Sequence, residues 1–132
     1  MYAIYVNSAK GINYAEAIVK GYKTIETRTR DVFKSFFKDS DAVRIAVIDT
    51  SRKIPMIVGF VVLHKGYKVC KDEFYDYKYF SKHLVPPGSK FAIQPNADFK
   101  WCYEITDAIS IWGCPAEVPT DAIRHGRSFC EI

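Results

Sequence analysis

The chain has 132 residues, of which 48% are hydrophobic and 26% are charged. This length and balance are typical of one globular domain and exclude a disordered or fibrous chain. The net charge of +4 is compatible with an anionic partner. The total alone does not predict such a partner, because nucleic-acid binding depends on clustered charge. We therefore expect a single domain over residues 1–132.

The sequence contains no feature that predicts export, a membrane or a metal. Residues 1–10 are too polar for a signal peptide, and no apolar run approaches the roughly 18 residues of a membrane span. We therefore expect a cytoplasmic protein without a membrane partner. The four cysteines are widely spaced and form no C-x-x-C pair, which favours free thiols. The three histidines also lack metal-ligand spacing, so no metal and no cofactor is assigned.

The N-terminal part predicts a strand, a short helix and a second strand. Residues 2–6 alternate and are rich in β-formers, which predicts the first strand. Asn13 is the expected N-cap of the helix, with Glu16 as its capping-box partner. Gly21 is expected to end the helix, since glycine adopts the left-handed conformation without steric cost. Residues 23–28 alternate β-branched and charged side chains, which predicts a strand with one solvated face.

The remainder of the chain predicts mainly strands. Residues 31–41 carry three phenylalanines at helical spacing and form either a short amphipathic helix or a packed loop. Residues 43–48 and 56–63 are apolar runs separated by a polar turn, which predicts an antiparallel pair. The other expected elements are a helix over 73–84, strands at 90–93, 101–105 and 108–112, and a short last helix that begins at Thr120. Many short strands with few short helices indicate a small, partly closed β-barrel.

Residues 21–28 read Gly-Tyr-Lys-Thr-Ile-Glu-Thr-Arg and follow the capped helix with the pattern G-x-K-x-x-E-x-R. On an ideal strand Glu26 and Arg28 lie on one face. A carboxylate beside a guanidinium stays ionised and orients the arginine fork, which suits a phosphate or the edge of a base. The alternative is that Glu26 and Arg28 form an ordinary exposed ion pair on the solvated side of a strand.

With the strand and helix that precede it, this pattern resembles the signature of the ASCH family, a branch of the PUA-like β-barrel folds. The resemblance is specific over residues 1–30 and general in strand order and length beyond them. It implies an α+β fold, a small PUA-like β-barrel of mixed or antiparallel strands flanked by short helices. It also implies that Lys23 reaches the cleft of Glu26 and Arg28, although Lys23 lies on the other face of an ideal strand.

Three alternative functions follow, the first two implied by the resemblance and the third suggested by the aromatic residues. The first is a module that binds RNA or a nucleotide-like ligand, with Lys23 and Arg28 on anionic groups and Glu26 as an acceptor. The second is a small hydrolase, either an amidohydrolase of modified nucleosides or a ribonuclease, with Lys23 and Glu26 as catalytic residues. In the small amidohydrolases of the family a threonine nucleophile occupies the position of Glu26, and Thr24 lies two residues earlier. The third is a protein-interaction domain with an aromatic surface.

Further candidate ligand contacts lie outside the strand of the motif. Ser8 ends the first strand, where it is either a ligand contact or a turn former. Trp101 and Tyr103 share a face of a predicted strand and are candidates for stacking on bases, with core packing as the alternative. The complete set of candidate ligand-binding residues is Ser8, Gly21, Lys23, Glu26, Arg28, Trp101 and Tyr103. The sequence does not indicate an oligomeric state.

Overall fold

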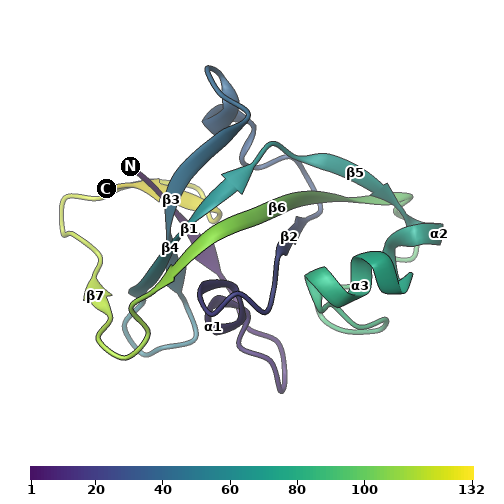
Figure 1. Cartoon of the computed structure of the whole chain (residues 1–132), viewed down its shortest axis with the longest axis horizontal. Coiled ribbons are helices and arrows are strands. Elements are labelled where there is room, and N and C mark those ends of the chain that lie inside the picture. The colour runs from purple at the N-terminus through teal and green to yellow at the C-terminus, as the bar shows by residue number, and fades with distance from the viewer.

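The chain folds around a nine-stranded mixed sheet, as a computed structural model of residues 1–132 shows (Figure 1). The strands are β1 (Tyr2–Val6), β2 (Ile25–Arg28), β3 (Ala42–Asp49), β4 (Met56–His64), β5 (Tyr67–Cys70), β6 (Phe99–Ser110), β7 (Ala116–Glu117), β8 (Ile123–His125) and β9 (Phe129–Glu131). Their order is β2-β6-β4-β3-β1-β9-β8, with β5 on β6 and β7 on β4. Only β1 and β3 pair in parallel. The helices are α1 (Tyr14–Val19), α2 (Lys71–Phe74), α3 (Tyr77–His83) and the 3-10 helix η1 (Lys34–Phe37).

The sheet curls because its longest strand pairs with different neighbours along its length. The first half of β6 pairs with β2 and β5, and its second half pairs with β4 across a register shift. Asp107 adopts a positive φ of 52° in this part of the strand. The result is a barrel-like sheet that remains open, with β2 and β8 as its end strands. The predicted α+β class and the predicted antiparallel pair of β3 and β4 are confirmed.

Helix α1 lies against the sheet because a glycine on β4 leaves room for it. A Cβ atom at Gly59 would lie 2.6 Å from a methyl group of Val19, at the end of α1. The helix buries Tyr14, Ala15, Ile18 and Val19. These side chains join the larger hydrophobic core, a cluster of 21 buried residues that fills the barrel. Helix α1 is therefore fixed against the sheet directly before the motif strand.

Several predicted elements differ from those in the structure. Residues 90–93 form a turn rather than a strand, since Ala92 N–H donates to the Ser89 carbonyl. The two strands predicted at 101–105 and 108–112 are one strand, β6, which continues across its irregularity. The helix predicted over 73–84 is interrupted between Phe74 and Tyr77, so α2 and α3 are separate.

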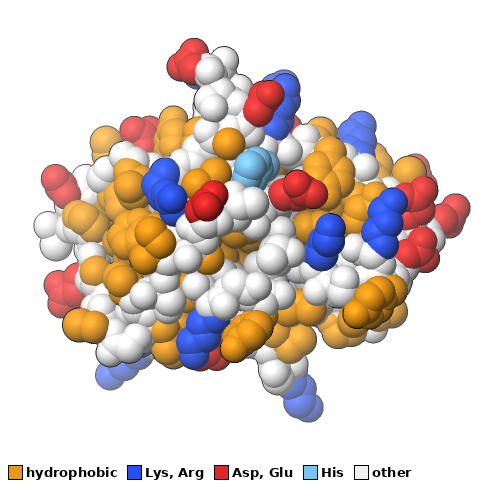
Figure 2. All heavy atoms as spheres, viewed as in Figure 1, with side chains coloured by type: hydrophobic (Ala, Val, Ile, Leu, Met, Phe, Trp, Pro, Cys, Tyr) orange, Lys and Arg blue, Asp and Glu red, His pale blue; other side chains and the backbone are white.

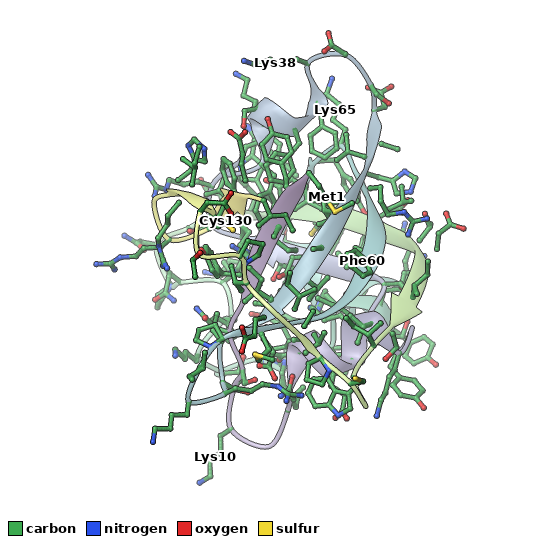
Figure 3. The ribbon with its side chains drawn as sticks, turned by 90° about the vertical axis from the view of Figure 1, so that its left-hand side faces the viewer. Met1, Lys10, Lys38, Phe60, Lys65 and Cys130 are labelled. Atoms are coloured by element: carbon green, nitrogen blue, oxygen red, sulfur yellow. The ribbon has the colours of Figure 1, made fainter.

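The C-terminal region was also predicted wrongly. The expected helix from Thr120 is replaced by strand β8, which forms a hairpin with β9. The hairpin in turn pairs β9 with β1, so the last strand lies beside the first. Figure 3 shows Cys130 on this hairpin, next to the purple strand β1. The hydrogen bonds between β9 and β1 join residues more than a hundred positions apart. The local spacing of residues does not indicate such pairing.

None of the helices has the length and apolar character needed to cross a membrane. The four cysteines are free thiols, with Cys102 and Cys130 buried.

Candidate functional site

The end of α1 lies directly before the motif and fixes where the motif strand begins. Asn13 accepts a hydrogen bond from the backbone N–H of Glu16 at 2.9 Å, as an N-cap does. Glu16 does not complete the predicted capping box, because its carboxylate pairs with Lys20 at 2.8 Å. Gly21 has a φ of +83° just after the C-cap Lys20, which confirms its predicted role.

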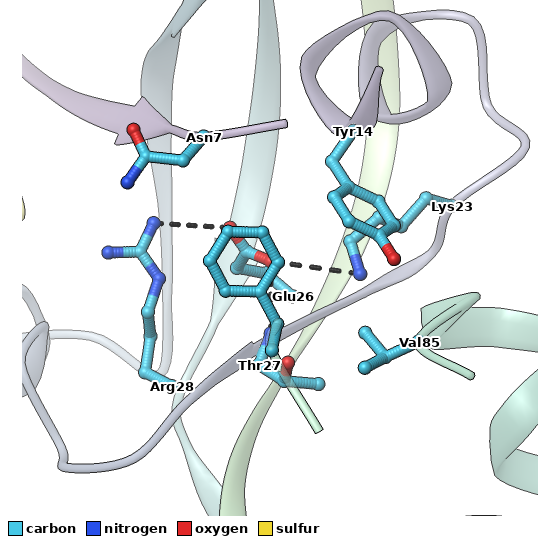
Figure 4. A pocket seen from close by; sticks show the side chains of 8 residues that line it. Asn7, Tyr14, Lys23, Glu26, Thr27, Arg28 and Val85 are labelled. Atoms are coloured by element: carbon cyan, nitrogen blue, oxygen red, sulfur yellow. Dashed lines mark hydrogen bonds and ion pairs between the residues drawn. The ribbon is translucent and has the colours of Figure 1, made fainter. Parts of the chain in front are cut away.

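Lys23 lies between the helix end and the first residue of β2. Its backbone N–H donates to the Ala17 carbonyl at 3.0 Å, so the end of α1 fixes its position. Because Lys23 precedes the regular pleat of β2, the alternation of a strand does not apply to it. Its ammonium group points toward Glu26, as Figure 4 shows, with Nζ and Oε1 3.7 Å apart.

Glu26 is the central residue of the motif. Its Oε2 accepts from an Nη of Arg28 at 3.1 Å, and its Oε1 accepts from the Thr27 backbone N–H at 3.0 Å. Only 8% of its side chain is exposed, compared with 19% for Arg28 and 1% for Lys23. An ordinary solvated ion pair is exposed on both partners. The structure therefore excludes the exposed-pair alternative for these side chains.

Arg28 connects the motif to the first strand. In addition to Glu26, its guanidinium donates to the Tyr5 carbonyl of β1 at 2.7 Å and lies over the ring of Phe33, 4.7 Å from its centroid. β2 does not pair with β1 in the sheet. Arg28 thus crosses the gap between these two strands with its side chain.

A cavity of about 110 Å³ opens at this gap (Figure 4). Lys23, Glu26 and Arg28 line it together with five residues that the sequence analysis did not select. These are Asn7, Tyr14, Thr27, Val85 and Phe91. The motif supplies charge on one side, while α1 and the segment after α3 supply apolar surface on the other.

The local charges shift the pKa values of the buried groups. Burial lowers the pKa of Lys23 to about 8, although Glu26 opposes this effect. Burial alone would raise the pKa of Glu26, but the charges of Arg28 and Lys23 outweigh it and hold that pKa below its ordinary value. Burial also lowers the pKa of Lys100, which senses the charge of Glu26. The cavity therefore contains an ionised carboxylate, a permanent cation and a lysine that loses its proton as the pH rises through about 8.

His83 supports Lys23 without contributing an acid or base. Its Nδ1 accepts from the Val85 backbone N–H at 2.9 Å, so its Nε2 carries the proton and donates to the Phe74 carbonyl at 2.7 Å. Burial lowers the pKa of His83 to about 4, so the ring stays neutral. Its backbone carbonyl accepts a hydrogen bond from the ammonium of Lys23. Lys23 is thereby held between Glu26 and the end of α3.

The other candidate residues do not line this cavity. Gly21 acts through the backbone conformation described above. Ser8 has a buried hydroxyl without a hydrogen-bond partner and lies next to the lining residue Asn7. Tyr103 is fully buried, and its hydroxyl donates to Asp31 at 2.7 Å, so the expected stacking surface is replaced by core packing. Trp101, on β6, is half-buried beside Phe99 of the same strand and Lys68 of β5.

The sequence carried a usable signal for only some of the missed lining residues. Tyr14 directly follows the predicted N-cap Asn13, and Thr27 belongs to the strand predicted over residues 23–28. Val85 and Phe91 follow α3, about sixty residues away in sequence, and come close because Thr24 N–H donates to the Lys82 carbonyl at 2.9 Å. No local pattern in residues 85–91 indicates this approach.

The arrangement suits the binding of a small polar group. Arg28 and Lys23 donate hydrogen bonds, Glu26 accepts them, and Val85 and Phe91 offer apolar contact. The volume of the cavity lies below the range of about 300–1,000 Å³ that encloses a drug-sized ligand. A nucleotide would therefore place only one of its parts inside. No group of three or more His, Cys, Asp or Glu side chains is positioned to hold a metal ion.

Solved ASCH structures from Zymomonas mobilis share this fold. One substituted form aligns with a TM-score of 0.67 and 16% identity, over 98% of this chain and 87% of that chain. The unsubstituted protein aligns with a TM-score of 0.63 and 18% identity, over 88% and 73% of the two chains. A second substituted form aligns with a TM-score of 0.62 and 18% identity, over 88% of this chain and 76% of that chain. No protein-family model and no curated protein matches the sequence.

At such low identity the alignments establish a common fold. They confirm what the motif and its preceding strand and helix predicted about the architecture. The protein therefore has the fold of these solved ASCH structures, in which a mixed β-sheet is flanked by short helices.

Proposed function

We propose that the protein is a binding module for RNA or a nucleotide, and that the ligand enters the cavity lined by Lys23, Glu26 and Arg28. The observation that carries the proposal is the convergence of these three charged side chains on one partly enclosed hollow. Placing charges in a poorly solvated site costs free energy. A cavity lined by such groups is a better candidate for a ligand site than an equally charged open surface.

The chemistry of the cavity matches the parts of a nucleotide. Two cations against one carboxylate leave the cavity with a positive balance when Lys23 is protonated, which favours an anionic ligand. The ionised Glu26 accepts from the amino group of a base, and the Arg28 fork donates to a base edge or a phosphate oxygen. The half-buried Phe91 provides an apolar face at the rim.

Fluorescence anisotropy with labelled short single-stranded RNA, together with equilibrium dialysis of nucleotides, tests this proposal. We expect Arg28→Ala to weaken binding about tenfold, the effect of losing one charge-assisted hydrogen bond. Arg28→Lys is expected to bind with intermediate affinity, because it retains the charge but not the fork. Circular dichroism of each variant establishes that the fold is intact.

Arg44→Ala is the matched control for Arg28→Ala. Arg44 also donates to a backbone carbonyl, that of Asp107 at 2.8 Å, but it is exposed and lines none of the cavities described here. We expect this variant to bind like the wild type. The proposal is wrong if the wild type binds none of these ligands, or if both alanine variants bind equally well.

Hydrolysis is the second candidate function, and the state of Lys23 favours it. A lysine whose pKa lies at about 8 is partly neutral near physiological pH and accepts a proton more readily than an ordinary lysine. Glu26 cannot supply the hydroxyl nucleophile of the family's amidohydrolases, but Thr27 lines the same cavity and carries a hydroxyl. Lys23 would then act as the general base toward Thr27 or a water molecule.

Assays of acylated cytidine and of labelled RNA test the hydrolase function. We expect turnover of one of these substrates by the wild type and its loss in Lys23→Met. Thr27→Val separates the two nucleophiles, because it abolishes turnover only if the hydroxyl attacks. Equal activity of Lys23→Met and the wild type, or no turnover of either substrate, would contradict this candidate.

A further inference from the structure

Three cavities are linked by the residues that line them. Asn7 lines both the cavity of the motif and a second one of about 330 Å³. Arg127 lines that second cavity and a third one of about 450 Å³. The surface is therefore continuous from the motif to the turn of the C-terminal hairpin.

Arginines occur along the whole of this surface, which we call the arginine track. Its members are Arg28 in the first cavity, Arg124 and Arg127 in the second, and Arg127 with Arg30 in the third. Arg30, Arg124 and Arg127 have no ion-pair partner. Asp31 is the acidic residue that lines the third cavity, and the Tyr103 hydroxyl already bonds to it. The charge of the track is therefore strongly positive.

The C-terminal hairpin carries two of these arginines, Arg124 and Arg127. Gly126 has a φ of +64° in the turn between β8 and β9, so the turn needs a residue that accepts this conformation. Arg124 lies over the ring of Tyr5, 4.4 Å from its centroid, and donates to the Gly126 carbonyl at 2.8 Å. Arg127 is exposed and makes no hydrogen bond or ion pair to another side chain. Arg124, on β8, is held against Tyr5 of β1, while Arg127 is free to meet a ligand.

Cations also gather elsewhere on the surface, but as lysines, since Lys34, Lys38 and Lys65 line a separate cavity together with Asp31. On the face in Figure 2, lysines and arginines alternate with acidic side chains. Mixed charge of this kind keeps a surface solvated without favouring an anionic partner. The track thus differs from the mixed charge of that face by its grouped cations, and from the lysine-lined cavity by its arginines.

We propose that the ligand is a single-stranded polynucleotide of several residues, whose backbone lies on the arginine track while one unpaired base enters the cavity of Glu26. This inference rests on the proposed function and specifies its ligand class. A cavity of about 110 Å³ admits a base only after it leaves a duplex, which favours a single strand. Arginine forks spaced along a groove match successive phosphates, whereas a mononucleotide engages only the first cavity.

Binding measured against ligand length tests the inference. The probes are a mononucleotide and labelled single-stranded RNAs of about four and about eight residues, with DNA of equal length as a further arm. We expect affinity to increase with length in the wild type. The double variant Arg124→Ala/Arg127→Ala should bind the longest RNA roughly tenfold more weakly. The slope of log K against the logarithm of the salt concentration should become shallower by about 1.4, because two phosphate contacts are lost. Binding of the mononucleotide should not change.

Lys71→Ala/Lys78→Ala is the matched control, because it removes two charges from exposed positions that line none of these cavities. It should bind every probe like the wild type. Arg127→Glu is a second test variant, since Arg127 makes no side-chain contact that the hairpin needs. It should weaken binding of the longest RNA at least as much as the double alanine variant does.

The outcomes separate this inference from the proposed function. If the mononucleotide and the longest RNA bind equally well and both depend on Arg28, the cavity binds nucleotides and the track inference is wrong. The same conclusion follows if Arg127→Glu and the lysine control bind equally well. If no probe binds in an Arg28-dependent way, the proposed function and the inference both fail.

Discussion

Two buried carboxylates in this protein, Asp49 and Glu26, share several properties but lie in different parts of the fold. Asp49 is 1% exposed and Glu26 is 6% exposed. Each pairs with an arginine, at an N–O distance of 3.1 Å in both cases. The pKa of each lies below its ordinary value, because the donors around it outweigh the effect of burial. Burial, pairing and a shifted pKa therefore do not distinguish them.

The surrounding groups do distinguish the two carboxylates. Asp49 accepts from the backbone N–H and hydroxyl of Ser51, from Arg52 and from the Asn13 side chain. These bonds close the turn after β3 and tie it to the N-cap of α1. Glu26 shares its charge with two cations and faces a cavity. We infer that a buried carboxylate indicates a ligand site only where its ion pair also lines a cavity.

The largest effect is expected for Glu26→Gln. This change leaves Arg28 and Lys23 without their counter-ion, and removing one partner of a buried pair costs about 3–5 kcal/mol of unfolding free energy. Arg28 also loses the group that orients it, so RNA affinity should fall. Urea denaturation and fluorescence anisotropy measure the two effects.

Glu16→Gln is the control for Glu26→Gln, because Glu16 also pairs with a lysine four residues away but on the exposed surface. Its expected cost is below about 0.5 kcal/mol. If both variants lose similar stability, the motif carboxylate behaves as a surface residue and the contrast drawn here is wrong.

A smaller effect, confined to stability, is expected for Asp49→Asn. The amide retains the shape but cannot accept from all four donors, which should lower the unfolding free energy by about 2 kcal/mol. RNA affinity should not change, since Asp49 lines none of the cavities. A loss of affinity as large as that of Glu26→Gln would contradict the distinction between the two carboxylates.

Acid should destabilise the protein through both carboxylates. The pKa of each is lower in the folded state than its ordinary value, 4.5 for Glu26 and 3.8 for Asp49. The stability that they contribute is thus present above those values and is lost as the pH falls through the lower, folded pKa. Urea denaturation between about pH 2 and pH 6 measures how the unfolding free energy falls with acid. This fall should be smaller in Glu26→Gln and in Asp49→Asn than in the wild type. A loss unchanged by either substitution would contradict this expectation.

The smallest effect is a decrease of RNA affinity at alkaline pH. Lys23 loses its charge as the pH rises through about 8, whereas Arg28 stays charged and the neighbouring thiol of Cys102, whose pKa burial raises to about 12, stays neutral. Affinity should therefore fall severalfold between about pH 7 and pH 9. Lys23→Arg should remove this dependence. Identical pH profiles for the two proteins would show that Lys23 does not face the ligand.

Part of the site could be predicted from the sequence because its signals are local. Asn13 and Gly21 define the two ends of α1 through capping and backbone conformation, which depend on a few neighbouring residues. The spacing of Glu26 and Arg28 on one strand face follows from the pleat. The position of Lys23 required the resemblance to a known family, since strand alternation places it on the opposite face.

The cavity could not be predicted because distant segments form it. Val85 and Phe91 reach the motif after α3, and Asn7 reaches it from the end of β1. Tyr103 was instead selected as a candidate for stacking on bases and proved to be a core residue. The alternation of its strand does not indicate which face is buried. The packing of Phe33 against its ring, with centroids 5.0 Å apart, places it in the core.

The sequence by itself determined the α+β class, the capped helix and the charged strand that follows it, because these depend on composition and on contacts within a few residues. Only the tertiary structure decided that β1 and β2 stay unpaired, that a cavity opens between them and that the C-terminal hairpin extends it with arginines. The physical reason is that strand pairing and side-chain burial join residues far apart in the chain, and their free energy depends on the whole fold.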